Sequence, residues 1–331
     1  MRILIIRFSS LGDIVLTQPI IQRLYDVFPE AELFFITKEQ YSAIPQLFGV
    51  PLKVVTYSDM LSAYSNLQQK QFDMVIDLQS KLNSFLIKHF CVRAKVFTYN
   101  KQRKLRVNIV EHKTQESIDS TLDLYQSALV KLALHMKQPL LADGLNNPKL
   151  FIQQPIMNKI NSSLNKETGK IYIAMFPGAT HHTKMYPVPW FVQMIQNADR
   201  KYHFWLMGNE DEMWLTSTVH QACKDNTTDL GGMFNVVELV DALTSAEGVI
   251  SNDSGPMHIA AALNKPQIAI FGSTHPRLGF RPLNDKAIIL SSDIKCQPCS
   301  LHGTRVCPKK HFACMLSIEP DSVLKALNNL F

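Results

Sequence analysis

The sequence has 331 residues, of which 46% are hydrophobic and 19% charged, and its formal net charge is +6. This composition describes a soluble globular protein, and the length fits two domains of ordinary size. The apolar runs fall far short of the ~18 residues that a membrane helix needs, which excludes a spanning segment. Because Arg7 and Asp13 interrupt the first apolar stretch, we expect no signal peptide and predict a cytoplasmic protein.

Apolar runs of strand length alternate with helix-like runs in both halves of the chain. Such alternation is typical of a parallel sheet that helices cover on both faces, so we predict an α/β protein with two such domains. The predicted strands are residues 2–6, 32–37, 52–57, 72–77 and 94–99 in the first half, and residues 171–175, 203–207, 248–251 and 267–271 in the second.

The two halves are separated by residues 139–169, which are rich in Pro, Asn, Lys and Ser. We place the linker within this stretch, near residues 155–168. The predicted domains are residues 1–160 and 161–318, followed by a C-terminal helix within 319–331.

The first predicted strand leads into a short turn of small residues, Ser9-Ser10-Leu11-Gly12-Asp13. The carboxyl end of a parallel strand faces the crevice where open α/β sheets bind ligands, so Asp13 is placed to meet a substrate. The alternative interpretation is an acid that the helix dipole favours in a first turn.

A second turn of the same kind runs from Ser251 to His258, between an apolar run and an Ala-rich run. Backbone N–H groups at such a helix start, together with the helix dipole, suit a diphosphate. An ordinary helix N-cap is the alternative interpretation. A third loop, Phe176 to Phe191, carries Lys184 just ahead of a predicted helix.

With these three segments in view, the chain resembles glycosyltransferase family 9, the bacterial heptosyltransferases of the lipopolysaccharide inner core. The family's S-S-x-G-D motif matches Ser9 to Asp13, and its D-[ST]-G-x-x-H element matches Asp253 to His258. Its Pro-Gly-[Ala/Ser] turn and following basic residue match Pro177 to Ala179 and Lys184, although the aromatic residue before the next proline is a tyrosine here. The Cys-rich tail looks like the ending of the second heptosyltransferase type.

The resemblance implies a GT-B fold, with two Rossmann-like domains facing across a cleft and the last helix packing back on the N-terminal, acceptor-binding domain. It also implies an inverting, metal-independent transfer of a heptose or a related sugar to a lipopolysaccharide inner-core acceptor. The expected donor is a nucleotide-diphosphate sugar, ADP-heptose in the family, bound by the C-terminal domain.

Residue roles follow from the resemblance together with the chemistry of each side chain. Asp13 is expected to act as general base and Lys184 to stabilise the leaving diphosphate. A tight turn is the alternative role for the Ser9–Gly12 segment, and a structural hydrogen bond is the alternative role for His258. The resemblance also implies an acidic residue near the nucleotide ribose, which matches Glu210. The expected substrate-binding residues are Ser9, Ser10, Gly12, Thr180, Glu210, Asp253, Ser254, Gly255 and His258.

Other function classes fit the sequence less well. No G-x-G-x-x-G fingerprint or Walker-type loop follows the predicted strands, and no D-x-D pair stands at a suitable strand end. We therefore expect no cofactor and no metal at the transfer site. Two alternatives stay open: a non-catalytic protein that binds sugar nucleotides or glycolipids, and an epimerase of sugar nucleotides on the same fold.

Positive charge gathers in the first half of the chain at Lys95, Lys101, Arg103, Lys104 and Arg106, beside two aromatic residues. Such a patch attracts polyanions, and we expect an anionic glycolipid and a peripheral contact with the inner membrane surface that carries it. A solvated helix face without a partner is the alternative. No recognised nucleic-acid motif accompanies the charge, so we expect no nucleic acid as partner.

Four of the six cysteines lie close together in the tail, at Cys296, Cys299, Cys307 and Cys314. In a cytosolic protein this pattern favours a zinc site or packed thiols over disulfides. The spacing C-x2-C-x7-C-x6-C is irregular for a zinc ribbon, so both interpretations stay open. Such a zinc ion would be structural, because four thiolates leave no open coordination position.

Overall fold

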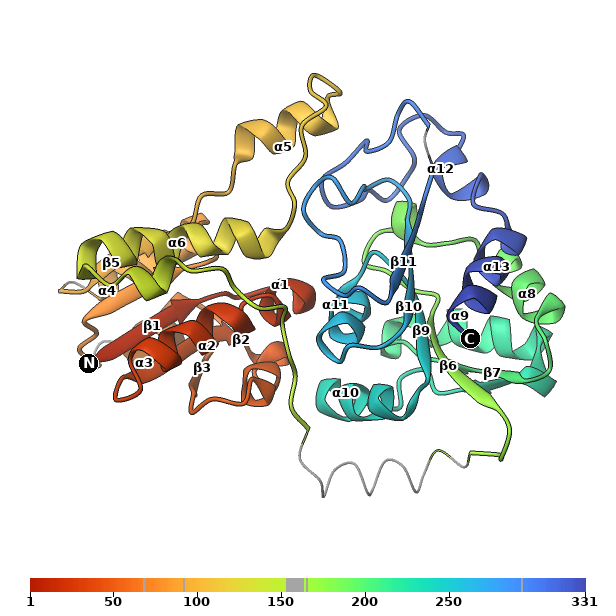
Figure 1. The fold of residues 1–331 in the computed structure, drawn as a ribbon, viewed down its shortest axis with the longest axis horizontal. Coiled ribbons are helices and arrows are strands. Elements are labelled where there is room, and N and C mark those ends of the chain that lie inside the picture. Colours follow the sequence, from red (N-terminus) through yellow and green to blue (C-terminus); the bar gives the residue numbers. More distant parts are fainter. Residues whose placement is uncertain (68–69, 92, 153–163, 165, 293) are drawn as a thin grey trace. The chain divides into compact units, whose positions relative to one another are not determined.

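The computed structural model describes residues 1–67, 70–91, 93–152, 164, 166–292 and 294–331, which form two compact units (Figure 1). The first unit consists of residues 1–102 and 120–151, and the second of residues 103–119 and the described residues from 152 onward. Most of the predicted linker, including residues 155–163, lies outside the described residues.

Residues 103–119 belong to the second unit although the sequence places them within the first predicted domain. Ile118 forms a parallel bridge with Leu278, and its N–H donates to the Arg277 carbonyl at 2.9 Å. The Arg106 guanidinium lies 5.0 Å from the centre of the Phe280 ring. These contacts between residues far apart in the sequence have no local sequence signal.

The first unit is built on one parallel sheet in the order β3-β2-β1-β4-β5. Ile3 to Ile6 of the central strand are completely buried, as expected for a parallel strand that is covered on both faces. The strands are β1 (Arg2–Ile6), β2 (Glu32–Lys38), β3 (Lys53–Tyr57), β4 (Met74–Asp77) and β5 (Lys95–Thr98). The helices are α1 (Leu11–Val15), α2 (Gln18–Val27), α3 (Met60–Leu67), α4 (Leu82–Phe90) and α6 (Thr121–Met136), with 3-10 turns η1 (Glu39–Tyr41), η2 (Ile44–Leu47) and η3 (Pro139–Ala142).

The second unit has a parallel sheet in the order β11-β10-β9-β6-β7-β8. The strands are β6 (Ile171–Phe176), β7 (Tyr202–Leu206), β8 (Thr227–Asp229), β9 (Gly248–Asn252), β10 (Gln267–Phe271) and β11 (Ala287–Ser291). The helices are α5 (Arg103–Val110), α8 (Val188–Asn197), α9 (Met213–Ala222), α10 (Val236–Ser245), α11 (Gly255–Ala262), α12 (Ala313–Leu316) and α13 (Pro320–Leu330), with 3-10 turns η4 (His182–Lys184), η5 (Glu210–Glu212) and η6 (Lys224–Asn226).

The nine predicted strands are present, and β8 and β11 are two that the sequence analysis missed. Both are edge strands of the second sheet. β8 is only three residues long and reads Thr-Thr-Asp, whereas all five residues of β11 are half-buried. Neither strand therefore carries the fully apolar run that marks the central strands.

The last helix is part of the core of the second unit. α13 packs against α8 and β10 of its own unit, with Val323, Ala326 and Leu327 in that unit's core. The Tyr202 hydroxyl at the start of β7 also donates to the Asn328 side chain at 3.0 Å. The apolar face of α13 thus packs within the second unit, and the packing on the N-terminal domain that the family resemblance implied stays a prediction.

The residues of the predicted basic patch are divided between the two units, and one of them is buried. Arg106 is only 7% exposed, and its guanidinium covers an aromatic ring. Lys101 donates to the Ser80 carbonyl at 2.9 Å in the first unit, whereas Arg103 and Lys104 belong to the second. Within the described residues, no helix is long and apolar enough to cross a membrane.

Candidate functional site

Asp13 stands on the first turn of α1, directly after the loop that follows the central strand of the first unit. Its Oδ2 atom accepts from Arg7 Nη2 at 2.7 Å and from the Ser10 hydroxyl at 2.8 Å. Its Oδ1 atom accepts from the Tyr125 hydroxyl of α6 at 3.2 Å. The carboxylate is therefore held in one orientation by a cation and two hydroxyl groups.

Arg7 is itself fixed by the sheet. Its side chain is almost buried, and Nη1 donates to the Leu78 carbonyl beyond β4 at 2.6 Å. Burial alone would lower the pKa of the guanidinium, but the charge of Asp13 and the neighbouring tyrosines Tyr125 and Tyr99 raise it above its ordinary value. Arg7 thus stays cationic beside the carboxylate at any working pH.

The other predicted residues of this turn surround Asp13. Besides its hydroxyl contact, the Ser10 backbone N–H donates to Asp13 Oδ2 at 3.2 Å. Gly12 is buried within α1, and Ser9 is half-buried in the loop before it. The structure brings Ser10 to the carboxylate, and the substrate contacts expected of Ser9, Ser10 and Gly12 remain predictions.

In the second unit, four adjacent strands, β10, β9, β6 and β7, end at the same edge of the sheet. Asn252, the last residue of β9, hydrogen-bonds to the loop that follows β6. Its side-chain oxygen accepts from the Tyr186 N–H at 3.0 Å, and its nitrogen donates to the Pro177 and Gly178 carbonyls at 3.0 and 3.1 Å. Asn252 was not among the predicted site residues, and its buried amide fixes the loop that carries Lys184.

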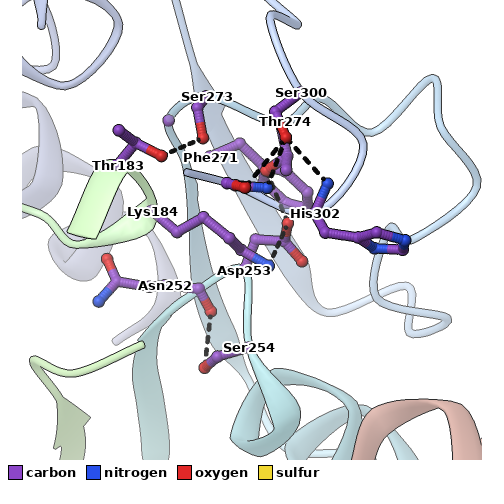
Figure 2. Close-up of polar contacts among 12 residues, drawn as sticks. Thr183, Lys184, Asn252, Asp253, Ser254, Phe271, Ser273, Thr274, Ser300 and His302 are labelled. Carbon is purple, nitrogen blue, oxygen red and sulfur yellow. Dashed lines mark hydrogen bonds and ion pairs between the residues drawn. The ribbon is translucent and has the colours of Figure 1, made fainter. Parts of the chain in front are cut away.

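Lys184 and Asp253, predicted from separate motifs, form an ion pair (Figure 2). Lys184 Nζ lies 2.9 Å from Asp253 Oδ2, and the side chains are only 14% and 6% exposed. The Thr274 hydroxyl, from the loop after β10, donates to the same oxygen at 2.6 Å. Thr274 was not predicted, because nothing in its local sequence marks it.

This pairing changes how the positive charge of Lys184 is interpreted. We expected a cation whose charge was available to a diphosphate, and the structure gives it a carboxylate partner. The pair is neutral as a whole, so a bound anion would have to share Lys184 with Asp253. In return, Asp253 and Thr274 hold the flexible lysine side chain in place.

The remaining predicted residues of this motif have different environments. Ser254 and Gly255 are half-buried at the start of α11, and the Ser254 hydroxyl contacts the Asn252 carbonyl at 3.3 Å. His258 is buried, with 6% of its surface exposed. Thr180 is exposed in the loop before η4. The substrate contacts predicted for these four residues stay predictions.

A ribose-binding acid is predicted at Glu210, and this role stays a prediction; a second acid, Glu212, lies two residues further on. Glu210 is exposed, whereas the Glu212 carboxylate lies directly over Gly178, where a side chain would collide with it, and accepts from the Asn209 N–H at 3.1 Å. Burial and the nearby Asp211 raise the pKa of the Glu212 carboxyl, although the Asn209 N–H opposes this. The two glycines that Glu212 approaches, Gly178 and Gly208, follow the adjacent strands β6 and β7.

Beside this acid lies an exposed apolar surface. Met213 and Trp214, the first residues of α9, are 50% and 63% exposed, and Met233 is 62% exposed. The Met213 side chain rests against Gly232, close to Glu210. Large apolar side chains that stay exposed together are typical of surfaces that bind a ligand or another macromolecule.

Comparison with known proteins now decides the family. The family model described as glycosyltransferase family 9 (heptosyltransferase) matches residues 60–310. The chain belongs to glycosyltransferase family 9. It is 22% identical to lipooligosaccharide heptosyltransferase 2 of Campylobacter jejuni over 340 residues, which cover 100% of this chain and 98% of that protein.

Two solved structures are similar over the whole chain. The structure of Escherichia coli ADP-heptose lps heptosyltransferase II has a TM-score of 0.77 and 21% identity, and covers 100% of this chain and 98% of that one. The E. coli heptosyltransferase WaaC with ADP has a TM-score of 0.68 and 17% identity, with 100% of both chains covered. The predicted GT-B fold of two Rossmann-like domains is confirmed. This member of family 9 is a glycosyltransferase of the heptosyltransferase type.

Proposed function

We propose that this glycosyltransferase moves a heptose from ADP-heptose to an inner-core acceptor of lipopolysaccharide, with inversion at the anomeric carbon. The observation that carries the proposal is the buried group of Lys184, Asp253 and Thr274 at one edge of the second sheet. Support for the donor and acceptor comes from relatives whose names specify ADP-heptose and lipopolysaccharide.

The nucleotide sugar would bind to the second unit. Its diphosphate would lie at Lys184 and at the backbone N–H groups that begin α11, because both favour negative charge. Its ribose would donate a hydroxyl to the Glu212 carboxylate, and its base would cover the apolar surface of Met213 and Met233. We favour Glu212 over Glu210 for this role, because Glu212 is the acid that lies over Gly178.

The acceptor hydroxyl would be activated by Asp13. Asp13 Oδ1 would take the hydroxyl proton while the acceptor oxygen forms its bond to the anomeric carbon and the bond to the donor diphosphate breaks. The electron pair of that bond leaves with ADP, whose charge Lys184 would stabilise. General-base assistance of this kind contributes about 10² to 10⁴ in rate.

The membrane contact expected for such an acceptor would use α3 and α4 rather than the basic residues predicted from the sequence. These two helices pack together and expose Leu61, Leu82 and Phe85 by 82%, 71% and 53%. A peripheral protein commonly places such side chains at the boundary between headgroups and acyl chains. We propose this apolar surface as the part of the first unit that faces the bilayer.

The experiment that tests the proposal combines ligand-induced thermal stabilisation with a transfer assay. A nucleotide at 100 times its Kd adds about 2.7 kcal/mol of stability. ADP should stabilise the wild type, and Lys184→Ala should weaken ADP binding by about 10- to 100-fold, because a hydrogen bond to a charged group is lost. Lys224→Ala, at an exposed lysine of η6, is the matched control and should bind ADP normally.

The transfer assay separates binding from chemistry. Asp13→Asn should bind ADP as the wild type does and lose transfer of heptose from ADP-heptose to a heptose-deficient lipopolysaccharide acceptor. If Lys184→Ala binds ADP as the wild type does, the assignment of Lys184 to the donor site is wrong. Donor turnover without any acceptor would favour the epimerase alternative, and ADP binding with no turnover would favour the binding-protein alternative.

A further inference from the structure

Lys101 lies at the edge of the first sheet where the strands end, the same edge that carries Asp13. It comes three residues after β5, and Asp13 stands on the helix that follows β1. The carboxyl ends of parallel strands meet at one edge of a sheet, and open α/β sheets bind their ligands there. The candidate general base therefore shares its edge of the sheet with a lysine.

Two contacts hold the Lys101 side chain in place. Its Nζ atom donates to the Ser80 carbonyl at 2.9 Å and lies 5.7 Å from the centre of the Tyr99 ring. Ser80 has a left-handed backbone with φ of 49°, which is uncommon for a residue other than glycine. The buried Asp77 side chain stabilises this turn, because its Oδ1 atom accepts from the Ser80 N–H at 2.8 Å. The carbonyl that holds Lys101 is thus itself fixed from the core.

The backbone on either side of Lys101 is fixed as well. The Asn100 N–H donates to the Ser127 hydroxyl of α6 at 2.7 Å, and Asn100 Oδ1 accepts from the Gln102 N–H at 3.0 Å. Gln102 is a second left-handed residue, with φ of 47°. Ordering a lysine costs more conformational entropy than ordering most side chains, so a lysine that is already held loses less of it when a ligand binds.

Two aromatic rings connect Lys101 to the candidate base. The Tyr99 ring packs edge-on against the Tyr125 ring, with centres 5.0 Å apart and planes at 80°. The Tyr125 hydroxyl in turn donates to Asp13 Oδ1 at 3.2 Å. Both tyrosines are buried, so the same packed pair of rings sets the positions of the ammonium and of the carboxylate. One saccharide of a few sugars can therefore contact both groups.

The surroundings of Lys101 favour a negatively charged ligand. Residues 78–110 contain eight Lys and Arg and no Asp or Glu. Clustered positive charge of this kind attracts anions. The Ser80 carbonyl and the Tyr99 ring are neutral groups, so these two contacts position the ammonium without cancelling its charge.

We propose that Lys101 binds an anionic group of the acceptor saccharide, a carboxylate or a phosphate, and thereby places the acceptor hydroxyl at Asp13. An ammonium is a compact point charge that suits either kind of oxyanion. The inference rests on the proposed function, because it gives the acceptor of that reaction a binding group in the first unit. Lys101 takes no part in proton transfer; it selects acceptors that carry an anion near the reacting hydroxyl.

The first test is acceptor affinity, measured by calorimetry on the full chain with deacylated, heptose-deficient lipopolysaccharide as the probe. Lys101→Gln keeps an N–H group for the Ser80 carbonyl and removes the charge. We expect this variant to bind the probe about 10- to 100-fold more weakly than the wild type, because a hydrogen bond to a charged group is lost. Its ADP affinity should be unchanged, since the proposed donor site lies in the second unit.

Lys70→Gln is the matched control. Lys70 is also half-buried and also donates to a backbone carbonyl, that of Asn66 at 2.8 Å, but it precedes β4 and so lies at the opposite edge of the sheet. This variant should bind the probe within about 2-fold of the wild type. Lys101→Arg keeps the charge and should bind the probe more tightly than Lys101→Gln.

A second measurement changes the acceptor and does not depend on how the variants fold. Enzymatic dephosphorylation removes the phosphates of the probe, and conversion to amides neutralises its carboxylates. One of these treatments should weaken binding to the wild type by about as much as Lys101→Gln does, and should weaken binding to Lys101→Gln much less. That treatment identifies the anion. If neither treatment weakens binding to the wild type, Lys101 does not bind an acceptor anion.

The transfer assay separates this proposal from the proposed function. If transfer occurs and Lys101→Gln raises the acceptor KM with little change in kcat, both proposals stand. If transfer occurs and Lys101→Gln has the acceptor affinity of the wild type, the Lys101 site is wrong and the function stands. If the probe binds through Lys101 and no heptose is transferred, the function is wrong and the site stands. A wild type that does not bind the probe, with or without ADP, overturns both.

Discussion

Arg7 Nη2 lies 2.7 Å from Asp13 Oδ2 in the first unit, and both side chains are largely buried. The Arg7 guanidinium therefore contacts the carboxylate of the candidate base directly. The charge of Asp13 raises the pKa of Arg7 against the effect of burial. Because this coupling is reciprocal, Arg7 favours the ionised form of Asp13 by the same interaction.

Replacing Arg7 should change the pH dependence of transfer. Because Arg7 Nη2 pairs with Asp13 Oδ2 at 2.7 Å, loss of the cation should move the acidic limb of the kcat/KM profile to higher pH. Activity should thus fall more at pH 6 than at pH 8 in Arg7→Met. Arg7→Lys keeps a charge at this position and should shift the limb less.

A structural defect alone would give a different result in Arg7→Met. Removing one partner of a buried ion pair costs about 3–5 kcal/mol of stability, so the protein should be assayed well below its melting temperature. If kcat/KM falls equally at all pH values while the limb stays in place, Arg7 acts only on folding.

Tyr125 should contribute to the rate without binding the donor. Burial raises the pKa of its phenol well above the ordinary value, so the hydroxyl stays neutral and can donate to Asp13 Oδ1. Tyr125→Phe removes one hydrogen bond, which typically contributes about 0.5–1.5 kcal/mol, so kcat should fall by about 2- to 12-fold. ADP affinity, measured by calorimetry, should be unchanged.

The matched control for Tyr125→Phe is Tyr202→Phe. Tyr202 is also completely buried, and its hydroxyl donates to Asn328 at 3.0 Å, away from the candidate base. The control should lose stability and keep its kcat. Equal kcat values for the two variants would show that the Tyr125 hydroxyl does not act through Asp13.

The sequence predicts those parts of the candidate site that lie within one short segment of the chain. Asp253 follows a buried strand directly, and Asp13 lies on the first turn of the helix that comes after one, so a strand-turn-helix pattern marks each of them within a single segment. Tyr125 and Thr274 could not be found in this way, because the chain brings them to Asp13 and Asp253 from 112 and 21 residues away. The same holds for α13, whose amphipathic pattern does not say which surface it covers.

Glu212 should matter for nucleotide binding and Glu210 should not. Glu212→Gln removes a carboxylate that would accept from the ribose, and we expect ADP affinity to fall by about 10-fold. Glu210→Gln removes an exposed charge two residues away and should leave ADP affinity within about 2-fold of the wild type. Both affinities can be measured by isothermal titration calorimetry at pH 8.

The pH dependence of ADP binding gives a second readout. Because burial raises the pKa of the Glu212 carboxyl, acidification should protonate it earlier than an ordinary glutamate and begin to weaken ADP binding there. Glu212→Gln should lack that part of the pH dependence. If Glu210→Gln loses ADP affinity and Glu212→Gln binds ADP as the wild type does, Glu210 is the acid that binds the ribose.

Thr274 is expected to act on the donor only through Asp253. Its hydroxyl donates to the carboxylate oxygen that also pairs with Lys184, and this oxygen is buried. Thr274→Val has the same shape without the donor, so Asp253 loses one hydrogen bond and holds Lys184 less firmly. We expect a loss of about 1–2 kcal/mol in stability and a several-fold weaker affinity for ADP. Thr274→Ser keeps the hydroxyl and should restore most of the affinity. If the valine variant loses stability but binds ADP as the wild type does, Lys184 does not depend on this hydrogen bond, and the neutral pair with Asp253 is sufficient to position it.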